Sequence, residues 1–152
     1  MAIMEPSRLA SRPVHTSAAA TIRAPRDRVF ALYARWQDWP RTFGRTIRGV
    51  RLVRQEGAVT VLDVDHVEGH VPNVMAVTAP DLIVLEERKR RFTARFENRF
   101  EPRADGTRYV VTADVSLQGW LRWLRFIAAP VIRSRIRRFV LEPIRLAAEG
   151  PT

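Results

Sequence analysis

The sequence ends in GWLRWLRFIAAPVIRSRIRRFVLEPIRLAAEG, residues 119–150, and this is the stretch that decides the fold. Apolar side chains recur along it every three or four residues, which places them on one face of an α-helix. A helix from Trp120 to Glu149 would be about 45 Å long at about 1.5 Å per residue. The predicted apolar stripe consists of Leu124, Ala128, Ile132, Ile136, Phe139 or Val140, Ile144 and Ala147.

Arginines also recur in this stretch, and most of them fall off the stripe: Arg122, Arg125, Arg133, Arg137 and Arg138. A basic helix could bind nucleic acid, lie on a membrane, or close over an apolar space within its own domain. We expect the stripe to be largely buried and the arginines to stay outside. Pro130 is expected to kink the helix, because proline removes one backbone hydrogen bond and clashes with the preceding turn.

The rest of the chain is dominated by strand-like patterns. Residues 14–23 are small and β-branched, and helical spacing follows over 24–36, with a short helix or ordered loop over 37–49. From residue 50 the period changes to two, and Gly, Pro and Asp residues mark turns between six runs. The runs cover residues 50–55, 58–68, 70–79, 82–91, 92–102 and 107–118.

One of these runs indicates how the sheet is covered. In FTARFENRF, residues 92–100, the phenylalanines share one face with Ala94 and Asn98, and polar or charged residues occupy the other. An antiparallel sheet with one apolar face needs a second layer, and only the C-terminal helix is long enough to supply it. The prediction is an α+β fold, in which a curved antiparallel sheet of seven strands wraps around a long C-terminal helix, with two short helices after the first strand.

Length and composition set the remaining bounds. The 152 residues fit one domain, predicted over 13–150 behind a flexible tail over 1–12, and the lack of cysteine excludes disulfides and thiolate metal sites. No apolar run approaches the roughly 20 residues of a spanning helix, and no signal peptide is evident, so a cytoplasmic location is predicted, possible membrane contact being peripheral. The net charge of +10 favours anionic partners, although it can equally serve solubility alone.

Three features together resemble the START-like (SRPBCC) superfamily of polyketide cyclases, lipid-transport domains and coenzyme Q-binding proteins. They are TIRAPRDRVFALYARWQDWPRTF over 21–43, FEPRADGTRYVVTADV over 100–115, and the long closing helix, so the resemblance runs from His15 to Glu149. It implies a helix-grip fold with a deep cavity between sheet and helix. Members bind apolar ligands there, and some catalyse cyclisation, dehydration or aromatisation of bound polyketides. The superfamily has no single catalytic motif to carry over.

The apolar strand faces predict which residues would line such a cavity. Asn98 could orient a ligand carbonyl, or it could satisfy the backbone or water. Trp120 and Trp123 could pack in the core, gate the cavity or anchor the chain to an apolar surface. The predicted ligand-binding residues are Trp39, Phe43, Met75, Phe92, Phe96, Asn98, Tyr109, Val111 and Trp123.

The densest polar cluster is DVDHVEGH, residues 63–70. Two histidines and a carboxylate could bind a metal ion, but Gly69 is expected to turn the chain and separate His70 from His66. No metal or other cofactor is therefore predicted. His66 shares a face with Leu62 and Val64, which points it inward and makes it the candidate general acid or base.

The predicted function is the binding of a small hydrophobic ligand, such as a lipid, a quinone or a polyketide-like molecule. The alternative is an enzyme of the polyketide cyclase or dehydratase type. Nucleic acid is disfavoured, because the helix stripe is committed to the sheet. The arginines could form a basic surface beside the cavity mouth that docks on an anionic membrane or an acidic carrier protein. They could instead be a solvated face neutralised by Glu86, Glu87 or Glu97.

Overall fold

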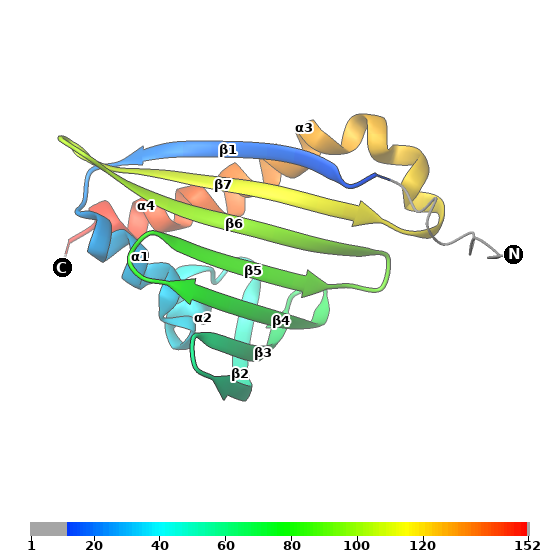
Figure 1. Cartoon of the computed structure of the whole chain (residues 1–152), viewed down its shortest axis with the longest axis horizontal. Coiled ribbons are helices and arrows are strands. Elements are labelled where there is room, and N and C mark those ends of the chain that lie inside the picture. The colour runs from blue at the N-terminus through cyan, green and yellow to red at the C-terminus, as the bar shows by residue number, and fades with distance from the viewer. Residues whose placement is uncertain (1–11, 152) are drawn as a thin grey trace, which may run out of the picture.

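Seven strands form a single antiparallel sheet in the order β1-β7-β6-β5-β4-β3-β2 (Figure 1). The structure is a computed structural model that describes residues 12–151. The predicted tail lies outside these residues except for Arg12, and the single domain over 13–150 stays a prediction. The strands are β1 (Val14–Ile22), β2 (Ile47–Glu56), β3 (Val59–His66), β4 (Gly69–Thr78), β5 (Leu82–Arg88), β6 (Phe92–Arg103) and β7 (Gly106–Leu117).

Strands β2 to β7 form a meander, since each pairs with the next along the chain. The first strand, β1, pairs with the last strand, β7, so the first and last strands along the chain are neighbours in the sheet. Short helices connect β1 to β2: α1 (Arg26–Ala34), a 3-10 turn η2 (Trp36–Asp38) and α2 (Trp39–Thr42). The predicted order of strands and helices is therefore confirmed.

The C-terminal helix lies behind the sheet in Figure 1 and confirms the predicted helix-grip arrangement. It consists of a 3-10 turn η3 (Gly119–Leu124), α3 (Arg125–Ile136), a π-helical segment η4 (Arg137–Leu141) and α4 (Glu142–Glu149). Pro130 lies inside α3, which continues through it to Ile136, and the kink expected there stays a prediction. An irregular turn precedes Pro143, where the wider π-helical segment accommodates a proline that cannot donate a backbone hydrogen bond.

The predicted stripe is buried only in part. Ile136 and Ile144 are buried, whereas Ala128, Ile132 and Val140 are half-buried and Leu124 is 40% exposed. After Ile136 the buried positions are Leu141, Ile144 and Ala148. Leu141 and Ala148 lie one residue after the predicted Val140 and Ala147, whereas Ile144 is a predicted position. A π-helical turn holds one extra residue, so η4 shifts the stripe by one position.

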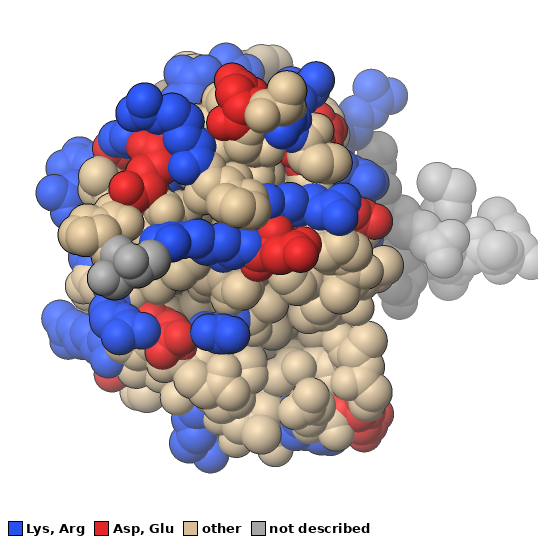
Figure 2. Space-filling view, turned by 90° about the vertical axis from the view of Figure 1, so that its left-hand side faces the viewer, with Lys and Arg blue, Asp and Glu red and all other residues tan. Residues whose placement is uncertain are grey.

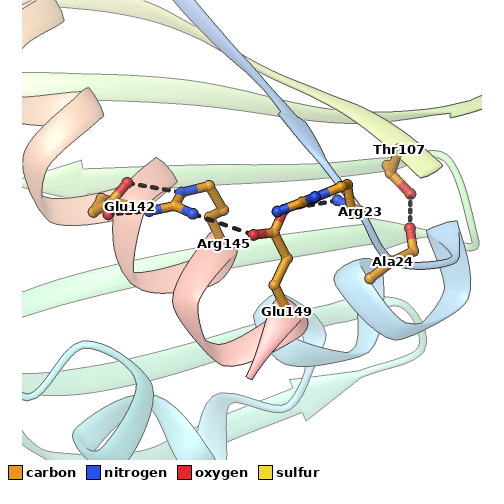
Figure 3. Close-up of polar contacts among 6 residues, drawn as sticks. All are labelled: Arg23, Ala24, Thr107, Glu142, Arg145 and Glu149. Atoms are coloured by element: carbon orange, nitrogen blue, oxygen red, sulfur yellow. Dashed lines mark hydrogen bonds and ion pairs between the residues drawn. The ribbon is translucent and has the colours of Figure 1, made fainter. Parts of the chain in front are cut away.

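The stretches that carry the resemblance meet at one corner of the fold (Figure 3). Thr107 donates its hydroxyl hydrogen to the carbonyl oxygen of Ala24 over 2.8 Å. The backbone N–H of Arg23 donates to Oε1 of Glu149 over 2.8 Å, and Arg145 donates to Oε2 of the same carboxylate over 3.1 Å. The end of β1, the start of β7 and the end of α4 are thereby joined.

Candidate ligand-binding cavity

A cavity of about 480 Å³ lies between the concave face of the sheet and the C-terminal helix. The packing of α1 and α4 fills the other end of this face, where Phe30 contacts Phe100 edge-on at 5.4 Å. The cavity walls are mainly apolar, and the sheet contributes Val64, Val71, Leu85, Phe92, Phe96, Val111, Val115 and Leu117. The helix contributes Leu121, Leu124, Ile127, Ala128, Val131, Ile132, Ile136, Phe139 and Val140.

An aromatic cluster forms one wall of the cavity. Trp39 and Phe43 are buried, and their rings pack edge-on against Tyr33 at 5.6 and 6.0 Å between centroids. The indole N–H of Trp39 donates to the carbonyl oxygen of Tyr33 over 2.8 Å, which fixes the short α2 turn against α1. This wall is held by hydrogen bonding as well as packing, so we describe it as preformed.

Buried hydrogen bonds hold the floor of the cavity. Asn98 is fully buried, and its side-chain N–H donates to the carbonyl oxygen of Ile83 over 3.2 Å. The hydroxyl of Tyr109 donates to Oδ1 of Asn98 over 2.5 Å. Burial raises the pKa of Tyr109 and of Tyr33, so both stay protonated phenols near neutral pH. Of the roles considered for Asn98, these contacts match hydrogen bonding to protein groups.

Ionisable side chains gather at the other end of the cavity, where β3, β4, β5 and α3 meet. Glu68 lies between two cations, with Nζ of Lys89 at 3.5 Å and a guanidinium nitrogen of Arg135 at 3.4 Å. Glu87 also lines the cavity, and no hydrogen bond or ion pair among residues 12–151 uses its carboxyl group. Burial raises the pKa of Glu87, an effect that Lys89 partly opposes.

His66 lines the cavity and is half-buried, at the end of β3. Its Nδ1 accepts a hydrogen bond from the backbone N–H of Glu68 at 3.3 Å, which places the proton of the neutral ring on Nε2. Burial and, after it, the charge of Lys89 lower the pKa of His66, so the neutral ring predominates at pH 7.

His70 does not share this site. The turn before it places its Nδ1 3.5 Å from Oδ1 of Asp63, away from His66 as the glycine turn predicted. No group of three His, Asp or Glu side chains in the described part of the chain could hold a metal ion.

The structure brings seven of the predicted site residues together at the cavity: Trp39, Phe43, His66, Phe92, Phe96, Asn98 and Val111. The other three predicted residues do not line the cavity. Met75 and Tyr109 are buried in the core outside the cavity walls, and Trp123 is 72% exposed. The alternation of apolar and polar residues identifies which face of the sheet a side chain is on. It does not show whether the helix or the cavity covers that face at a given position along the strand. Trp123 lies in η3, where Leu121 and Leu124 line the cavity and Trp123 is exposed to solvent.

Sequence reasoning missed the polar members of the cavity and most of its helical wall. Glu87 and Lys89 continue the alternation of Ile83 and Leu85 from β5. The period of two therefore predicts that both lie on the same face of the sheet as Leu85, which lines the cavity. Asn73 follows the same rule on β4, where it lies directly opposite Glu87. Charged residues were expected to face solvent, so Glu87 and Lys89 were not predicted to line the cavity.

The segment at the start of the C-terminal helix exposes an apolar surface, which we call the mouth surface. Phe126 is 84% exposed, and Leu124, Ile127 and Val131 are both exposed and part of the cavity wall. The cavity therefore reaches the surface here. The mouth surface consists of Trp120, Trp123, Leu124, Phe126, Ile127 and Val131.

The five arginines of this helix that fall off the stripe are exposed, as predicted. Glu86 and Glu97 pair with Arg95, at 2.9 and 3.6 Å, so the expected neutralisation of the helix by sheet glutamates is wrong. No ion pair within residues 12–151 involves the five arginines that fall off the stripe: Arg122, Arg125, Arg133, Arg137 and Arg138. At the opposite end of the molecule, basic and acidic side chains are intermixed (Figure 2).

Comparison with solved structures finds chains of similar fold. The chain is similar to the di-domain ARO/CYC StfQ from the steffimycin biosynthetic pathway, with 14% identity and a TM-score of 0.74 over 90% of this chain and 50% of that one. It spans about half the length of that di-domain protein. It is also similar to the Zhui aromatase/cyclase from Streptomyces sp. R1128, with 15% identity and a TM-score of 0.72 over 89% and 93% of the two chains.

A third similar structure is a START superfamily protein from Mycobacterium smegmatis, with 14% identity and a TM-score of 0.67 over 89% of this chain and 97% of that one. At these identities the likeness is one of fold. No protein-family model matches the sequence, and no curated protein matches it at a significant level. No helix within residues 12–151 is long and apolar enough to cross a membrane.

Proposed function

We propose that this protein binds a small hydrophobic ligand, of the lipid, quinone or polyketide kind, in the cavity between sheet and helix. The observation that carries the proposal is a mainly apolar cavity of about 480 Å³. Small-molecule sites in proteins have volumes of roughly 300–1,000 Å³ and mostly apolar walls with a few polar groups. The similar folds described as aromatase/cyclase and START superfamily proteins support a ligand of this kind.

Binding can be tested by filling the cavity. Ala128 is a half-buried wall residue of α3, and an Ala128→Trp variant would place an indole in the space that the ligand needs. Native mass spectrometry of the wild-type chain should detect a bound apolar molecule, and an apolar fluorescent probe should bind it in titrations. Ala128→Trp should bind the probe at least tenfold more weakly, which is about 1.4 kcal/mol.

Ser134→Trp is the matched control, because Ser134 is exposed on the same helix and lies outside the cavity wall. Equal probe affinity of wild type and a folded Ala128→Trp variant would contradict binding in this cavity.

The second candidate function is enzymatic, namely cyclase- or dehydratase-type chemistry on the bound ligand. The specific observation in its favour is His66, a neutral imidazole at the cavity wall whose Nε2 carries the proton. Such a group can donate a hydrogen bond to a ligand oxygen, and in its other tautomer it can accept a proton at Nε2 and then return it as the imidazolium. No metal ion or cofactor enters this proposal.

Binding and turnover must be measured separately to decide between the two functions. If the protein is an enzyme, His66→Ala should keep ligand affinity within a few-fold and lower turnover by roughly 10²–10⁴-fold. His70→Ala serves as the control, because His70 lies beside Asp63 and not at the cavity. Unchanged turnover in His66→Ala would remove His66 from the reaction.

The proposed partner of the mouth surface is an anionic membrane. Exposed aromatic and aliphatic side chains there adjoin arginines that have no acidic partner among residues 12–151, and the ring of Trp123 lies 5.3 Å from the guanidinium carbon of Arg122. Arginines attract anionic headgroups with about 1 kcal/mol each, and apolar side chains can enter the interface between headgroups and acyl chains. Docking here would place the cavity opening against a source of apolar ligand.

Flotation with liposomes tests this partner. The chain should float with vesicles rich in phosphatidylserine at low salt, less at high salt, and little with pure phosphatidylcholine. An Arg122→Gln/Arg125→Gln variant should lose most of the flotation, whereas Arg95→Gln, in an ion pair on the sheet, should not. If wild type ignores acidic vesicles at low salt, membrane docking is wrong, and an acidic carrier protein becomes the partner to test.

A further inference from the structure

Glu87 is the ionisable group of the cavity that neither the fold nor the charged cluster explains. It lies on β5, the central strand of the sheet, with Asn73 of β4 directly opposite it. Its sequence neighbour Glu86 points to the other face and forms an ion pair with Arg95 at 2.9 Å. Glu68, by contrast, already has Lys89 and Arg135 as partners. The carboxyl of Glu87 has no such partner within residues 12–151 and faces the cavity.

Asn73 provides a second unused hydrogen-bonding atom beside Glu87. Its side chain is 3% exposed, and its side-chain N–H donates to the carbonyl oxygen of Val71 over 3.0 Å. This bond fixes the amide and leaves Oδ1 without a hydrogen-bond donor from residues 12–151. Side chains directly opposite on antiparallel strands have Cβ atoms about 5 Å apart, so one ligand group can reach both.

We propose that Glu87 and Asn73 form the polar recognition point of the cavity and bind a hydroxyl group of an otherwise apolar ligand. The ligand O–H donates to Oδ1 of Asn73, and the carboxyl of Glu87, in its protonated form, donates a hydrogen bond to the ligand oxygen. A hydroxyl is the simplest group that both donates and accepts. A ligand carboxylate lacks the donor hydrogen that Oδ1 requires.

Energetics favour a ligand group at this point. Both residues line the cavity, so an apolar ligand would cover their polar atoms and leave them unpaired, which costs free energy. A hydroxyl ligand would instead supply a hydrogen-bond partner to each group. The inference rests on the proposed ligand-binding function and adds the chemical class of the ligand.

The test uses two probes of nearly equal shape, 2-naphthol and 2-methylnaphthalene, titrated by calorimetry against the full chain. Wild type should prefer 2-naphthol by roughly fivefold, the equivalent of one net hydrogen bond. Glu87→Leu should lose or reverse this preference while still binding 2-methylnaphthalene, which also shows that the variant is folded. Glu87→Gln, whose amide can donate and accept, should retain part of it.

Glu86→Leu is the matched control, because it changes the adjacent glutamate on the opposite face and should leave the preference intact. If the probes bind wild type with equal affinity, or if the preference survives in Glu87→Leu, the recognition point is wrong while ligand binding stands. If neither probe binds wild type, the proposed ligand-binding function fails together with the inference.

Discussion

Gly106 occupies a position at which the fold cannot accept a side chain. It begins β7 with φ of 143°, and a Cβ atom there would lie 2.1 Å from the carbonyl oxygen of Ile22. This close approach brings Thr107 within hydrogen-bonding distance of Ala24. The Gly-Thr-Arg sequence that resembles the START-like pattern therefore has a physical reason, namely the tight junction of β7 with the end of β1.

Gly106→Ala should lower the free energy of unfolding by roughly 2–3 kcal/mol, because the new methyl group meets backbone that cannot move aside. Urea unfolding followed by circular dichroism measures the change. Gly69→Ala is the control, since Gly69 has φ of 123° but nothing within 4 Å of an added Cβ. A loss at position 106 no larger than that at position 69 would show that backbone conformation, not contact, requires the glycine.

For single residues, the sequence predicted correctly which face of the sheet a side chain lies on. It did not predict whether that side chain lines the cavity or packs in the core. The alternation in β6 placed Phe92, Phe96 and Asn98 on the concave face, where the structure has them. The same reasoning placed Met75 at the cavity although core surrounds it. Depth depends on which helix covers a given height of the sheet, and this is a property of packing that a period of two does not contain.

The C-terminal helix shows what periodicity predicts for a whole element and what it misses. Its existence, its extent and its position on the sheet followed from the apolar stripe. The π-helical segment η4 could not be predicted in this way, because one extra residue in a turn does not change the spacing of the apolar residues that precede it. The buried stripe consequently passes through Leu141 in η4 and Ala148 in α4.

Ile136 is the buried residue on which α3 depends. It is 3% exposed at the last turn before η4, so Ile136→Asp would bury a charge without a partner and should lower the free energy of unfolding by roughly 3–5 kcal/mol. Chemical denaturation of purified protein tests this value. Ser134→Asp, on the exposed side of the same helix, should change it by under about 1 kcal/mol. A folded and equally stable Ile136→Asp variant would contradict the packing of α3.

For the whole molecule, the cavity carboxyl gives stability an unusual dependence on pH. Burial raises the pKa of Glu87 above its ordinary value of 4.5, so the folded state holds this proton more tightly than the unfolded state. Between these two pKa values the folded state binds more protons, and stability falls as pH rises. The charges of Lys89 and Arg135 oppose this rise in pKa, and the charge of Glu68 adds to it.

Glu87→Gln removes the titrating group and should therefore gain stability relative to wild type as pH rises above the ordinary glutamate pKa of 4.5. Urea unfolding of both proteins at a series of pH values gives the difference in free energy at each pH. A wild type that becomes more stable than Glu87→Gln towards alkaline pH would mean that the carboxylate has a cationic partner in the folded protein.

The contact between Arg23 and Glu149 joins residues that are 126 positions apart, and β1 pairs with the last strand of the sheet. While the ribosome makes this chain, the meander can assemble hairpin by hairpin, but the first strand must wait for a neighbour that is synthesised last. Such long-range pairing slows folding, and an unpaired strand edge invites association with other chains. We expect the nascent protein to depend on chaperones until its final helix has left the exit tunnel.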